Sequence, residues 1–449
     1  MPSSIIDSIY YKDMFGTPSM RGVFSDENRF QKWLDTEVAL AKAEAELGII
    51  PNGIENLIED AARLENLNLE EMKADFDKVG FPILPFVKQL NKACDPETAK
   101  WIHYGATTQD ILDTGTVLQM KEGLELIEND LKGIVEALSD LSTDHMHTVM
   151  AGRTFQQLAA PITFGYKTAV WLDELLRHQE RLNEIKSRLL VGQCAGAVGT
   201  FATLDDKGLE VQRIMMGYLG LETPSITWHT ARDRWAELVS YFALLSATLA
   251  KIANEVAILM RSEIGELSEP FEAGRGASTT LPQKRNPISC EPIIAIAPRL
   301  RELAGSQLTA MIQEHERGVG QMNIEWMVIP EAFVLMSGSL FHSRFILENL
   351  WVGKETMKAN LELGGGLLMA ESVMMGLAPK LGKAEAHHLV YTAASLAFEN
   401  KISLRDALLK DSKIMEVLNL KQLDELLDPI NYVGVSKLMV EEVLKKSKN

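Results

Sequence analysis

Apolar residues along this chain recur every three or four positions over long stretches, which is the spacing of an amphipathic α-helix. The clearest run consists of Trp235, Leu238, Phe242, Leu245, Leu249, Ile252, Val256 and Leu259. Its spacing alternates between three and four without a break, so it predicts a long bundle helix with a coiled-coil-type seam. Similar patterns predict long helices over residues 117–144 and 160–190. Strand-like alternation is scarce, and the predicted fold class is all-α.

A helix near the N-terminus has clear start and stop signals. Ser25 is a good capping residue, and Asp26 and Glu27 follow it in the first turn, where the helix dipole favours negative charge. Gly48 and Pro51 come after the last apolar positions and predict the end of the helix.

The chain is too long for one hydrophobic core, because 449 residues exceed the usual size of a single domain. Proline and glycine clusters predict three helical domains, over residues 1–112, 113–353 and 354–449. The central domain is a bundle of long helices, which a polar loop at 266–287 interrupts. A glycine triplet at 364–366 is expected to form a turn that opens the last domain.

Charge and composition exclude several classes of function. A net charge of −17 argues against binding to a nucleic-acid backbone, but a few local cations can still hold an anionic substrate. No apolar window long enough for a membrane span and no signal-peptide pattern stand out, so we expect a cytoplasmic protein that does not bind membranes. Cys94, Cys194 and Cys290 are far apart, which predicts neither a disulfide scaffold nor a zinc site.

The most informative segment lies between two helical patterns and reads Gly274-Arg-Gly-Ala-Ser-Thr-Thr-Leu-Pro-Gln-Lys-Arg-Asn-Pro287. Its residue types suit a substrate with carboxylates. Ser278 has an oxygen that can act as a base when it is activated, Lys284 is a cation, and Asn286 is a hydrogen-bond donor. On residue types alone, a solvated basic linker remains equally open.

The order of residues in this segment resembles the Ser-Ser-x-Met-Pro-x-Lys-x-Asn-Pro loop of the fumarase/aspartase superfamily. Further segments resemble that family in the same order along most of the chain: 15–26, 103–110, 152–157, 228–234 and 325–331. The nearest branch resembles the bacterial 3-carboxy-cis,cis-muconate lactonizing enzymes, and the adenylosuccinate lyases are similar at a greater distance.

The resemblance implies a fold, an assembly and a reaction. Members of the family are homotetramers with a twenty-helix core, and their active sites lie where motifs from three subunits meet. They remove a weakly acidic proton next to a carboxylate, which gives an aci-carboxylate dianion, and then expel a group from the adjacent carbon. The sequence has no metal-ligand spacing, and we expect neither a cofactor nor a metal here.

The resemblance also assigns roles within the loop. Ser278 takes the position of the family's catalytic base. Lys284 and Asn286 match the residues that hold the substrate carboxylate and the developing charge. Thr279 replaces the second family serine and keeps a hydroxyl group.

Two other motifs supply expected substrate contacts. Thr107, Thr108 and Gln109 match a carboxylate-binding motif, although the same residues also suit a helix cap, and both roles can hold together. Thr154 and Gln157 belong to a motif that in fumarases and adenylosuccinate lyases reads Gly-x-Thr-His-x-Gln.

Several positions depart from the more distant relatives. Phe155 stands where that motif has its histidine, so a histidine acid at this position is ruled out and the general acid is unassigned. Arg232 and Arg234 beside His229 can clamp an anion, or Arg232 and Asp233 can form a structural pair at a helix start, and both readings stay open. Glu325 is expected to form a hydrogen bond in the site. Met14 and Phe15 align with an Arg-Tyr pair that contacts phosphate in adenylosuccinate lyases.

The sequence therefore predicts an enzyme that acts on a small polycarboxylate by proton transfer beside a carboxylate. A 3-carboxy-cis,cis-muconate cycloisomerase is the leading hypothesis. A C–N lyase or epimerase acting on an N-substituted succinate is an alternative on the same fold. The third reading is a non-catalytic structural helical oligomer, against which the joint presence of Ser278, Lys284 and Asn286 speaks.

Overall fold

The structure is a computed structural model that describes residues 4–272 and 274–448. Nineteen α-helices make up most of the described chain, with a few 3₁₀ turns and two small two-stranded sheets. The predicted all-α class is confirmed.

The described chain forms two compact units. One comprises residues 1–130, 178–249 and 292–341, and the other comprises 131–177, 250–291 and 342–449. Each boundary falls inside a long helix or at its first residues. The three predicted domains, 1–112, 113–353 and 354–449, therefore stay a prediction.

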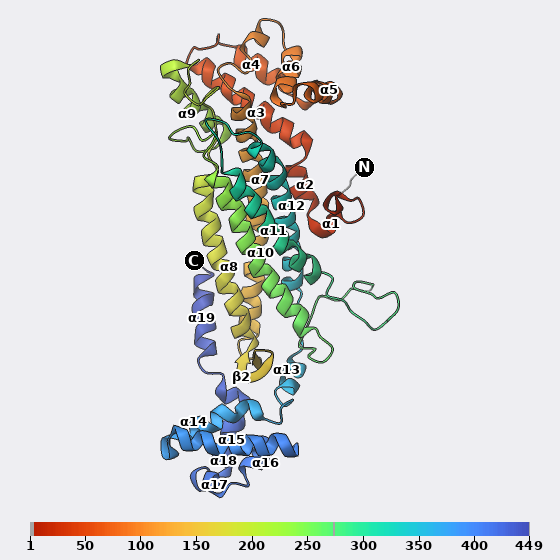
Figure 1. The fold of residues 1–449 in the computed structure, drawn as a ribbon, viewed down its shortest axis with the longest axis vertical. Helices are drawn as coiled ribbons and strands as arrows, with labels where there is room; N and C mark the ends of the chain where they lie inside the picture. The colour runs from red at the N-terminus through yellow and green to blue at the C-terminus, as the bar shows by residue number, and fades with distance from the viewer. Residues whose placement is uncertain (1–3, 273, 449) are drawn as a thin grey trace. The chain divides into compact units, whose positions relative to one another are not determined.

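In the first unit, short helices pack around α3. Their bounds are α1 (Lys12–Phe15), α2 (Pro18–Val23), α3 (Asp26–Glu46), α4 (Ile54–Ala61), α5 (Leu69–Val79), α6 (Ile83–Ala93) and α9 (Gly208–Leu219). The predicted cap of α3 is confirmed, because the Ser25 side chain accepts a hydrogen bond from the Asn28 amide. Figure 1 shows α4, α5 and α6 grouped beside α3, where Trp33, Leu34 and Phe86 belong to one buried cluster.

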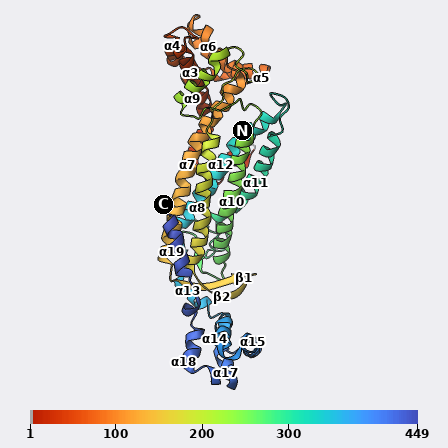
Figure 2. The ribbon, with the colours of Figure 1, turned by 90° about the vertical axis from the view of Figure 1, so that its left-hand side faces the viewer.

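Long helices run through the middle of the chain: α7 (Thr108–Asp144), α8 (Phe164–Leu189), α10 (Asp233–Leu259), α11 (Cys290–Ala310) and α12 (Gln321–Glu348). All eight residues of the predicted seam from Trp235 to Leu259 are buried in α10. The predicted helix over 160–190 begins later than expected, because residues up to Thr163 belong to a strand. Within each unit, segments of these helices lie alongside one another (Figures 1 and 2).

The second unit contains a β-hairpin that the hydrophobic pattern did not predict. Strands β1 (Val149–Thr154) and β2 (Gln157–Thr163) pair antiparallel, with a bulge between Gly152 and Arg153. Figure 2 shows the hairpin near α13 (Lys354–Asn360). Two further two-residue strands, β3 (Leu267–Ser268) and β4 (Trp351–Val352), also pair antiparallel.

The C-terminal helices of the second unit have a core of their own, made of Val373, Leu377, Leu389 and their neighbours. Their bounds are α14 (Ala370–Leu381), α15 (Lys383–Asn400), α16 (Leu404–Leu408), α17 (Ser412–Val417), α18 (Leu420–Leu427) and α19 (Ser436–Lys446). The glycine triplet at 364–366 precedes them as a turn, in which Gly365 and Gly366 have positive φ.

Two helices, α10 and α12, are long and apolar enough by composition to cross a membrane. Core helices of helical bundles have the same composition, and 67% of the most apolar window of α12 is buried within the chain. The value for α10 is 44%, so more than half of its most apolar window is not buried by this chain alone.

A close backbone crossing in the first unit gives a test of the packing. Gly338 lies within α12, and a Cβ atom there would approach the backbone of Phe15 and Gly16 to between 2.6 and 2.9 Å. We expect Gly338→Ala to destabilise the protein by about 1–3 kcal/mol, because the backbone of the N-terminal segment has to shift. The measurement is urea unfolding followed by circular dichroism.

Gly305 provides the matched control, because it also lies within a helix, α11, but a Cβ atom there meets nothing within 4 Å. Gly305→Ala should stabilise the protein by about 0.5–1 kcal/mol. Equal effects of the two substitutions would contradict the described packing.

Candidate active site

The segment that carries Ser278 is a loop between β3 and the start of α11, and Figure 1 draws it as an open excursion. Its neck is closed by Asn286, whose backbone and side-chain N–H groups both donate to the Gly276 carbonyl, at 3.1 and 3.0 Å. Gly276 has a φ of +69°, and a Cβ atom there would lie 2.8 Å from the Asn286 carbonyl oxygen. The neck therefore requires glycine at this position.

Ser278 lies just inside this neck, and its hydroxyl oxygen accepts two backbone hydrogen bonds. The donors are the N–H groups of Thr280, at 3.3 Å, and Leu281, at 3.1 Å. Serine side chains often accept backbone hydrogen bonds of this kind in turns, but here the two hydrogen bonds also have a chemical consequence. Two N–H dipoles directed at one oxygen stabilise a negative charge on it and so favour the ionised hydroxyl.

The tip of the loop presents polar groups to solvent. The Lys284 side chain is exposed and forms no ion pair with a carboxylate in the described part of the chain. Among the residues that the structure describes, the hydrogen-bond partner of the Thr279 hydroxyl is the neighbouring Thr280 hydroxyl, at 3.4 Å. The loop therefore offers a free cation and two hydroxyl groups within a few residues of Ser278.

Beyond the tip, the loop is anchored where α11 begins. The buried carboxylate of Glu269 accepts hydrogen bonds from the backbone N–H groups of Ser289 and Cys290 at 2.8–3.1 Å. Arg275 donates to the Ser289 hydroxyl at 2.5 Å and lies over the Phe345 ring. Burial, together with the Glu269 charge, raises the pKa of the Cys290 thiol, so this cysteine stays protonated. The base of the loop is fixed while its tip is exposed.

Thr154 and Gln157 are paired at the end of the hairpin β1–β2, where both side chains are exposed. The two-residue turn between them consists of Phe155 and Gln156, which have φ values of 50° and 66°. The Phe155 side chain is fully exposed. The hairpin thus presents the predicted contacts at its tip, in the same unit as the loop.

The other predicted residues lie in the first unit, in a buried polar network at the start of α7. Asp110 accepts hydrogen bonds from the backbone N–H groups of Thr107, Ala195 and Gly196, at 2.9–3.1 Å. It also pairs with Nε2 of His229, at 2.8 Å. Both side chains are almost fully buried. His229 therefore has a structural partner in the Asp110 carboxylate.

Arg232 is the most enclosed member of this network. Its guanidinium forms two hydrogen bonds with Asp113, at 2.7 and 3.0 Å, and two with Glu325, at the same distances. The side chain has no exposed surface and lies between the rings of Trp228 and Trp235. Of the two roles weighed for Arg232, the structural one matches this geometry, but its partners are Asp113 and Glu325 and not the predicted Asp233.

Gln109 is also fully engaged within the chain. Its amide group donates to Asp113 and to the His229 carbonyl, at 3.1 and 2.8 Å, and its oxygen accepts from Arg317 at 2.7 Å. The hydroxyl groups of Thr107 and Thr108, in contrast, make no hydrogen bond to the described residues, and both threonines are partly exposed. These two hydroxyls remain available to a substrate.

Burial raises the pKa of Glu325, although Arg232 opposes this shift, so the Glu325 carboxylate depends on its partners for its charge. Gln307 donates a further hydrogen bond to it at 2.9 Å. Glu325 therefore connects helix α12 to Arg232 and Gln307.

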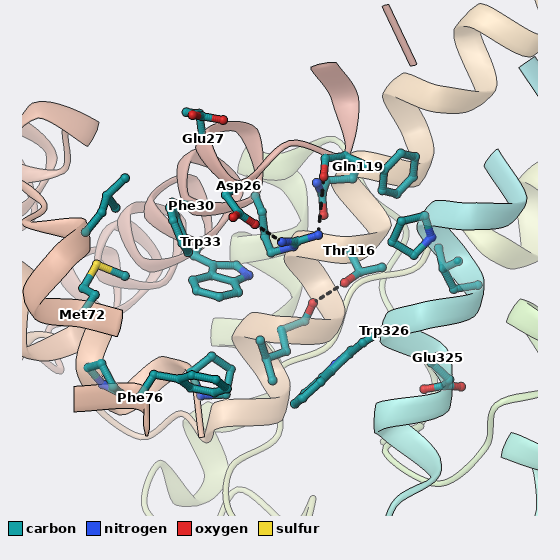
Figure 3. Close-up of a pocket in the computed structure, with 18 of the residues that line it drawn as sticks. Asp26, Glu27, Phe30, Trp33, Met72, Phe76, Thr116, Gln119, Glu325 and Trp326 are labelled. Carbon is teal, nitrogen blue, oxygen red and sulfur yellow. Dashed lines mark hydrogen bonds and ion pairs between the residues drawn. The ribbon is translucent and has the colours of Figure 1, made fainter. Parts of the chain in front are cut away.

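Glu325 also lines a cavity of about 550 Å³ in the first unit. Figure 3 shows its walls, which are mostly apolar and come from α3, α5, α7 and α12. They include Phe30, Trp33, Met72, Phe76 and Trp326. The Gln119 amide and the Thr116 hydroxyl at the wall both donate to backbone carbonyls. This mostly apolar lining does not suit a polycarboxylate.

Among the described residues, no group of three or more His, Cys, Asp or Glu side chains is arranged to hold a metal ion. The polar groups at the tip of the loop, the Lys284 ammonium and the Thr279 and Thr280 hydroxyls, are of a kind that suits an organic anion.

Sequence reasoning missed four residues that organise these sites. Asp110 and Asp113 hold His229 and Arg232, and their spacing of three on one helix face was the available signal. Arg153 and Glu266 form a buried ion pair in the second unit, and no local pattern pointed to it.

Comparison with known proteins identifies the class. Residues 14–301 match the family described as "Lyase", and residues 366–443 match the family described as "Adenylosuccinate lyase C-terminus". The chain belongs to the fumarase/aspartase superfamily and is an enzyme of that superfamily. The reading as a non-catalytic structural oligomer is therefore dropped.

The relatives cover nearly the whole chain. N-acetyl-S-(2-succino)cysteine lyase of Dickeya dadantii is 41% identical over 445 residues, which are 99% of this chain and 98% of the relative. 3-Carboxy-cis,cis-muconate cycloisomerase of Pseudomonas aeruginosa is 41% identical over 433 residues, 96% and 94% of the two chains. The crystal structure of 3-carboxy-cis,cis-muconate lactonizing enzyme from Pseudomonas putida is 37% identical, with a TM-score of 0.94 over 98% and 99% of the chains.

A buried acid in the first unit gives a test of the electrostatics. The Glu44 side chain is fully buried, and neither carboxylate oxygen has a hydrogen-bond partner among the described residues. Burial and the nearby Glu37 raise its pKa to about 9. A carboxyl group whose pKa is raised by folding stabilises the protein below its unfolded pKa, and this contribution is lost as the pH rises.

We expect the wild type to lose stability relative to Glu44→Gln as the pH rises from about 4.5 towards 9, by about 3 kcal/mol up to pH 7. The measurement is the urea midpoint of both proteins at pH 5 and pH 8, with the exposed Glu65→Gln as control. The same pH dependence in all three proteins would show that Glu44 titrates normally.

Proposed function

We propose that the protein catalyses proton transfer at a carbon beside a carboxylate of a small polycarboxylate, with Ser278 as the base. The observation that carries this proposal is the pair of backbone N–H groups, from Thr280 and Leu281, directed at the Ser278 hydroxyl oxygen. A free serine is far too weak a base for a carbon acid. Two fixed dipoles lower the cost of its ionised form.

The reaction then proceeds in two steps. The Ser278 alkoxide takes the proton from the carbon, and the electron pair of the broken C–H bond spreads onto the carboxylate. This aci-carboxylate collapses to form a C=C bond and expels the group on the adjacent carbon with its bonding electrons. In the reverse direction Ser278 returns the proton to the carbon after the group has added.

Lys284 and Asn286 would stabilise the extra negative charge of the intermediate. Lys284 suits this role because its ammonium group has no partner among the described residues and can pair with the dianion. The proposed contacts to the other carboxylates of the substrate are Thr107, Thr108, Thr154, Gln157 and Thr279. Four buried residues would support these contacts indirectly, by fixing the backbone around residues 107–110: Gln109, His229, Arg232 and Glu325.

The leading substrate is 3-carboxy-cis,cis-muconate, in which a carboxylate oxygen is the group that adds and leaves. The similarity to the enzymes from Pseudomonas aeruginosa and Pseudomonas putida supports this choice. Phe155 also supports it, because an apolar ring replaces the histidine of the more distant relatives.

A second candidate is a succinate substituted at carbon 2 through sulfur or nitrogen. The relative from Dickeya dadantii favours it, since that lyase is equally identical and matches 99% of this chain. In this substrate too, the proton that Ser278 would remove lies beside a carboxylate, and only the leaving atom differs. One or two side chains in the pocket decide between such substrates.

A spectrophotometric screen separates the two candidates. It compares kcat/KM for 3-carboxy-cis,cis-muconate, N-acetyl-S-(2-succino)cysteine, iminodisuccinate and argininosuccinate. Efficient turnover of one compound assigns the substrate, and failure with every polycarboxylate would contradict the proposed function.

We further propose that the protein is a cytoplasmic homotetramer. The partly uncovered apolar window of α10 supports assembly, and Leu244 within this helix is 57% exposed. All three cysteines are free thiols, which agrees with a reducing compartment.

A substitution at Ser278 tests the assignment of the base. Ser278→Ala should lower kcat by about four orders of magnitude, because the alanine has no group that can accept the proton. The kcat of the variant is measured with the substrate found by the screen, over long incubations because the rate is low. Circular dichroism tests whether folding is unchanged.

Thr280→Ala is the matched control, because it keeps the backbone N–H that donates to Ser278 and removes only a neighbouring hydroxyl. It should retain activity within about tenfold of the wild type. Activity of Ser278→Ala at that same level would show that Ser278 is not the base.

A separate prediction concerns assembly. Light scattering at micromolar concentration should give the mass of a tetramer, with or without added metal chelator. Leu244→Glu should shift the protein towards smaller species, because it places a charge on an apolar surface. A monomeric wild type, or loss of activity on chelation, would contradict the proposal.

Adenylosuccinate should be a poor substrate. A nucleotide phosphate requires cations or N–H groups, and Met14 and Phe15 have uncharged side chains where the relatives place Arg and Tyr. The test compares kcat/KM for adenylosuccinate and 3-carboxy-cis,cis-muconate. A value for adenylosuccinate of about 10⁵ M⁻¹s⁻¹ or more would contradict the choice of 3-carboxy-cis,cis-muconate as the leading substrate.

A further inference from the structure

The second unit contains a buried ion pair between Arg153 in strand β1 and Glu266, which directly precedes β3. Nη1 and Nη2 of Arg153 donate to the two oxygens of Glu266 at 2.9 and 2.7 Å. The Glu266 side chain is fully buried, and that of Arg153 is 18% exposed. This two-point geometry fixes the orientation of the two groups as well as their distance.

Asn360, the last residue of α13, extends the pair into a three-part network. Its side-chain amide donates to Oε1 of Glu266 and to the Ile264 carbonyl, both at 2.8 Å. The backbone of Glu266 is held as well, by hydrogen bonds with Leu259 and Gly353 at 2.9 Å. The charged pair therefore joins the hairpin β1–β2 to the fixed base of the segment that leads into the Ser278 loop.

The position of Arg153 gives the network a direct effect on the hairpin tip. Arg153 follows the bulge in β1 and immediately precedes Thr154. The next two residues, Phe155 and Gln156, form a turn in which both φ values are positive, a conformation that normally favours glycine or asparagine. The hairpin is thus held at Arg153, directly beside a turn whose backbone is costly to maintain.

The energetics of buried ion pairs explain why stability alone does not account for this one. Removing two charges from water costs roughly as much as their attraction returns, and apolar side chains of similar size are often equally stable. What an apolar pair cannot supply is the fixed orientation of a bidentate contact.

We propose that Arg153 is a positioning residue, which through Glu266 holds the Thr154–Gln157 hairpin tip in the geometry that its substrate contacts require. This inference rests on the proposed function, because it takes Thr154, Gln157 and Ser278 to act on the substrate. Arg153 itself does not touch the substrate. Its effect passes through the backbone of Thr154.

The test replaces the whole pair, since removing one partner leaves an unpaired buried charge and lowers stability for a trivial reason. In the double variant Arg153→Met/Glu266→Met no charge is left unpaired, so the melting temperature should fall less than in either single variant, chiefly through the lost Asn360 hydrogen bond. The value of kcat per folded enzyme should fall by about 10- to 100-fold, because a displaced contact loses its alignment with the reacting carbon. Arg153→Lys keeps the charge but loses the bidentate fork, so its kcat should lie between those of the wild type and the double variant.

The control is a second ion pair of the same unit, Lys167–Glu255, which is partly buried and lies outside the hairpin and the loop. Lys167→Met/Glu255→Met should keep the wild-type kcat. A kcat for Arg153→Met/Glu266→Met equal to that of the control, with both proteins folded, would overturn the proposal.

Hydrogen exchange of the hairpin amides tests the inference without any turnover. The amides at 154–157 should exchange faster in Arg153→Met/Glu266→Met than in the wild type, while those of α15 stay unchanged. Unchanged exchange at the tip overturns the positioning role. If the wild type acts on none of the polycarboxylates, the proposed function fails, and the exchange measurement still decides whether Arg153 holds the tip.

Discussion

A serine hydroxyl can remove a proton from carbon only if its ionised form is stabilised, and this requirement shapes the loop from 274 to 287. The neck between Gly276 and Asn286 sets the path of the backbone, so that the next amide groups turn back towards the Ser278 oxygen. Glycine is required there because of its positive φ and the closeness of the Asn286 carbonyl. The proposed base therefore depends on backbone geometry more than on a neighbouring side chain.

Each unit supports its proposed substrate contacts with buried charges. In the first, Asp110 ties the backbone of Ala195 and Gly196 to the start of α7, and Arg232 joins Asp113 to Glu325. In the second, Glu269 fixes the first residues of α11. Such groups are expensive to bury and gain their value from fixed orientation. The proposed substrate contacts Thr107 and Thr108 are partly exposed and Lys284 is exposed, so buried charges lie behind each proposed contact rather than at it.

Helical periodicity was sufficient to predict the long helices, because burial along one face leaves a direct mark on the sequence. The seam of α10 and the cap of α3 are examples. The hairpin β1–β2 was missed, since its strands are short and contain Gly152 and Pro161. Local patterns also could not reveal the partners of Arg232, because Asp113 and Glu325 lie about a hundred residues away in sequence. Motif order identified the superfamily, whereas the structure supplied the contacts within each motif.

The central claim is that Ser278 exchanges a proton with the carbon beside a carboxylate, and solvent deuterium tests it most directly. The substrate found by the screen is incubated in D₂O with wild type or Ser278→Ala, and NMR follows deuterium at that carbon. The account predicts incorporation at this single position by the wild type and none by Ser278→Ala. Incorporation by Ser278→Ala at the wild-type rate would contradict it.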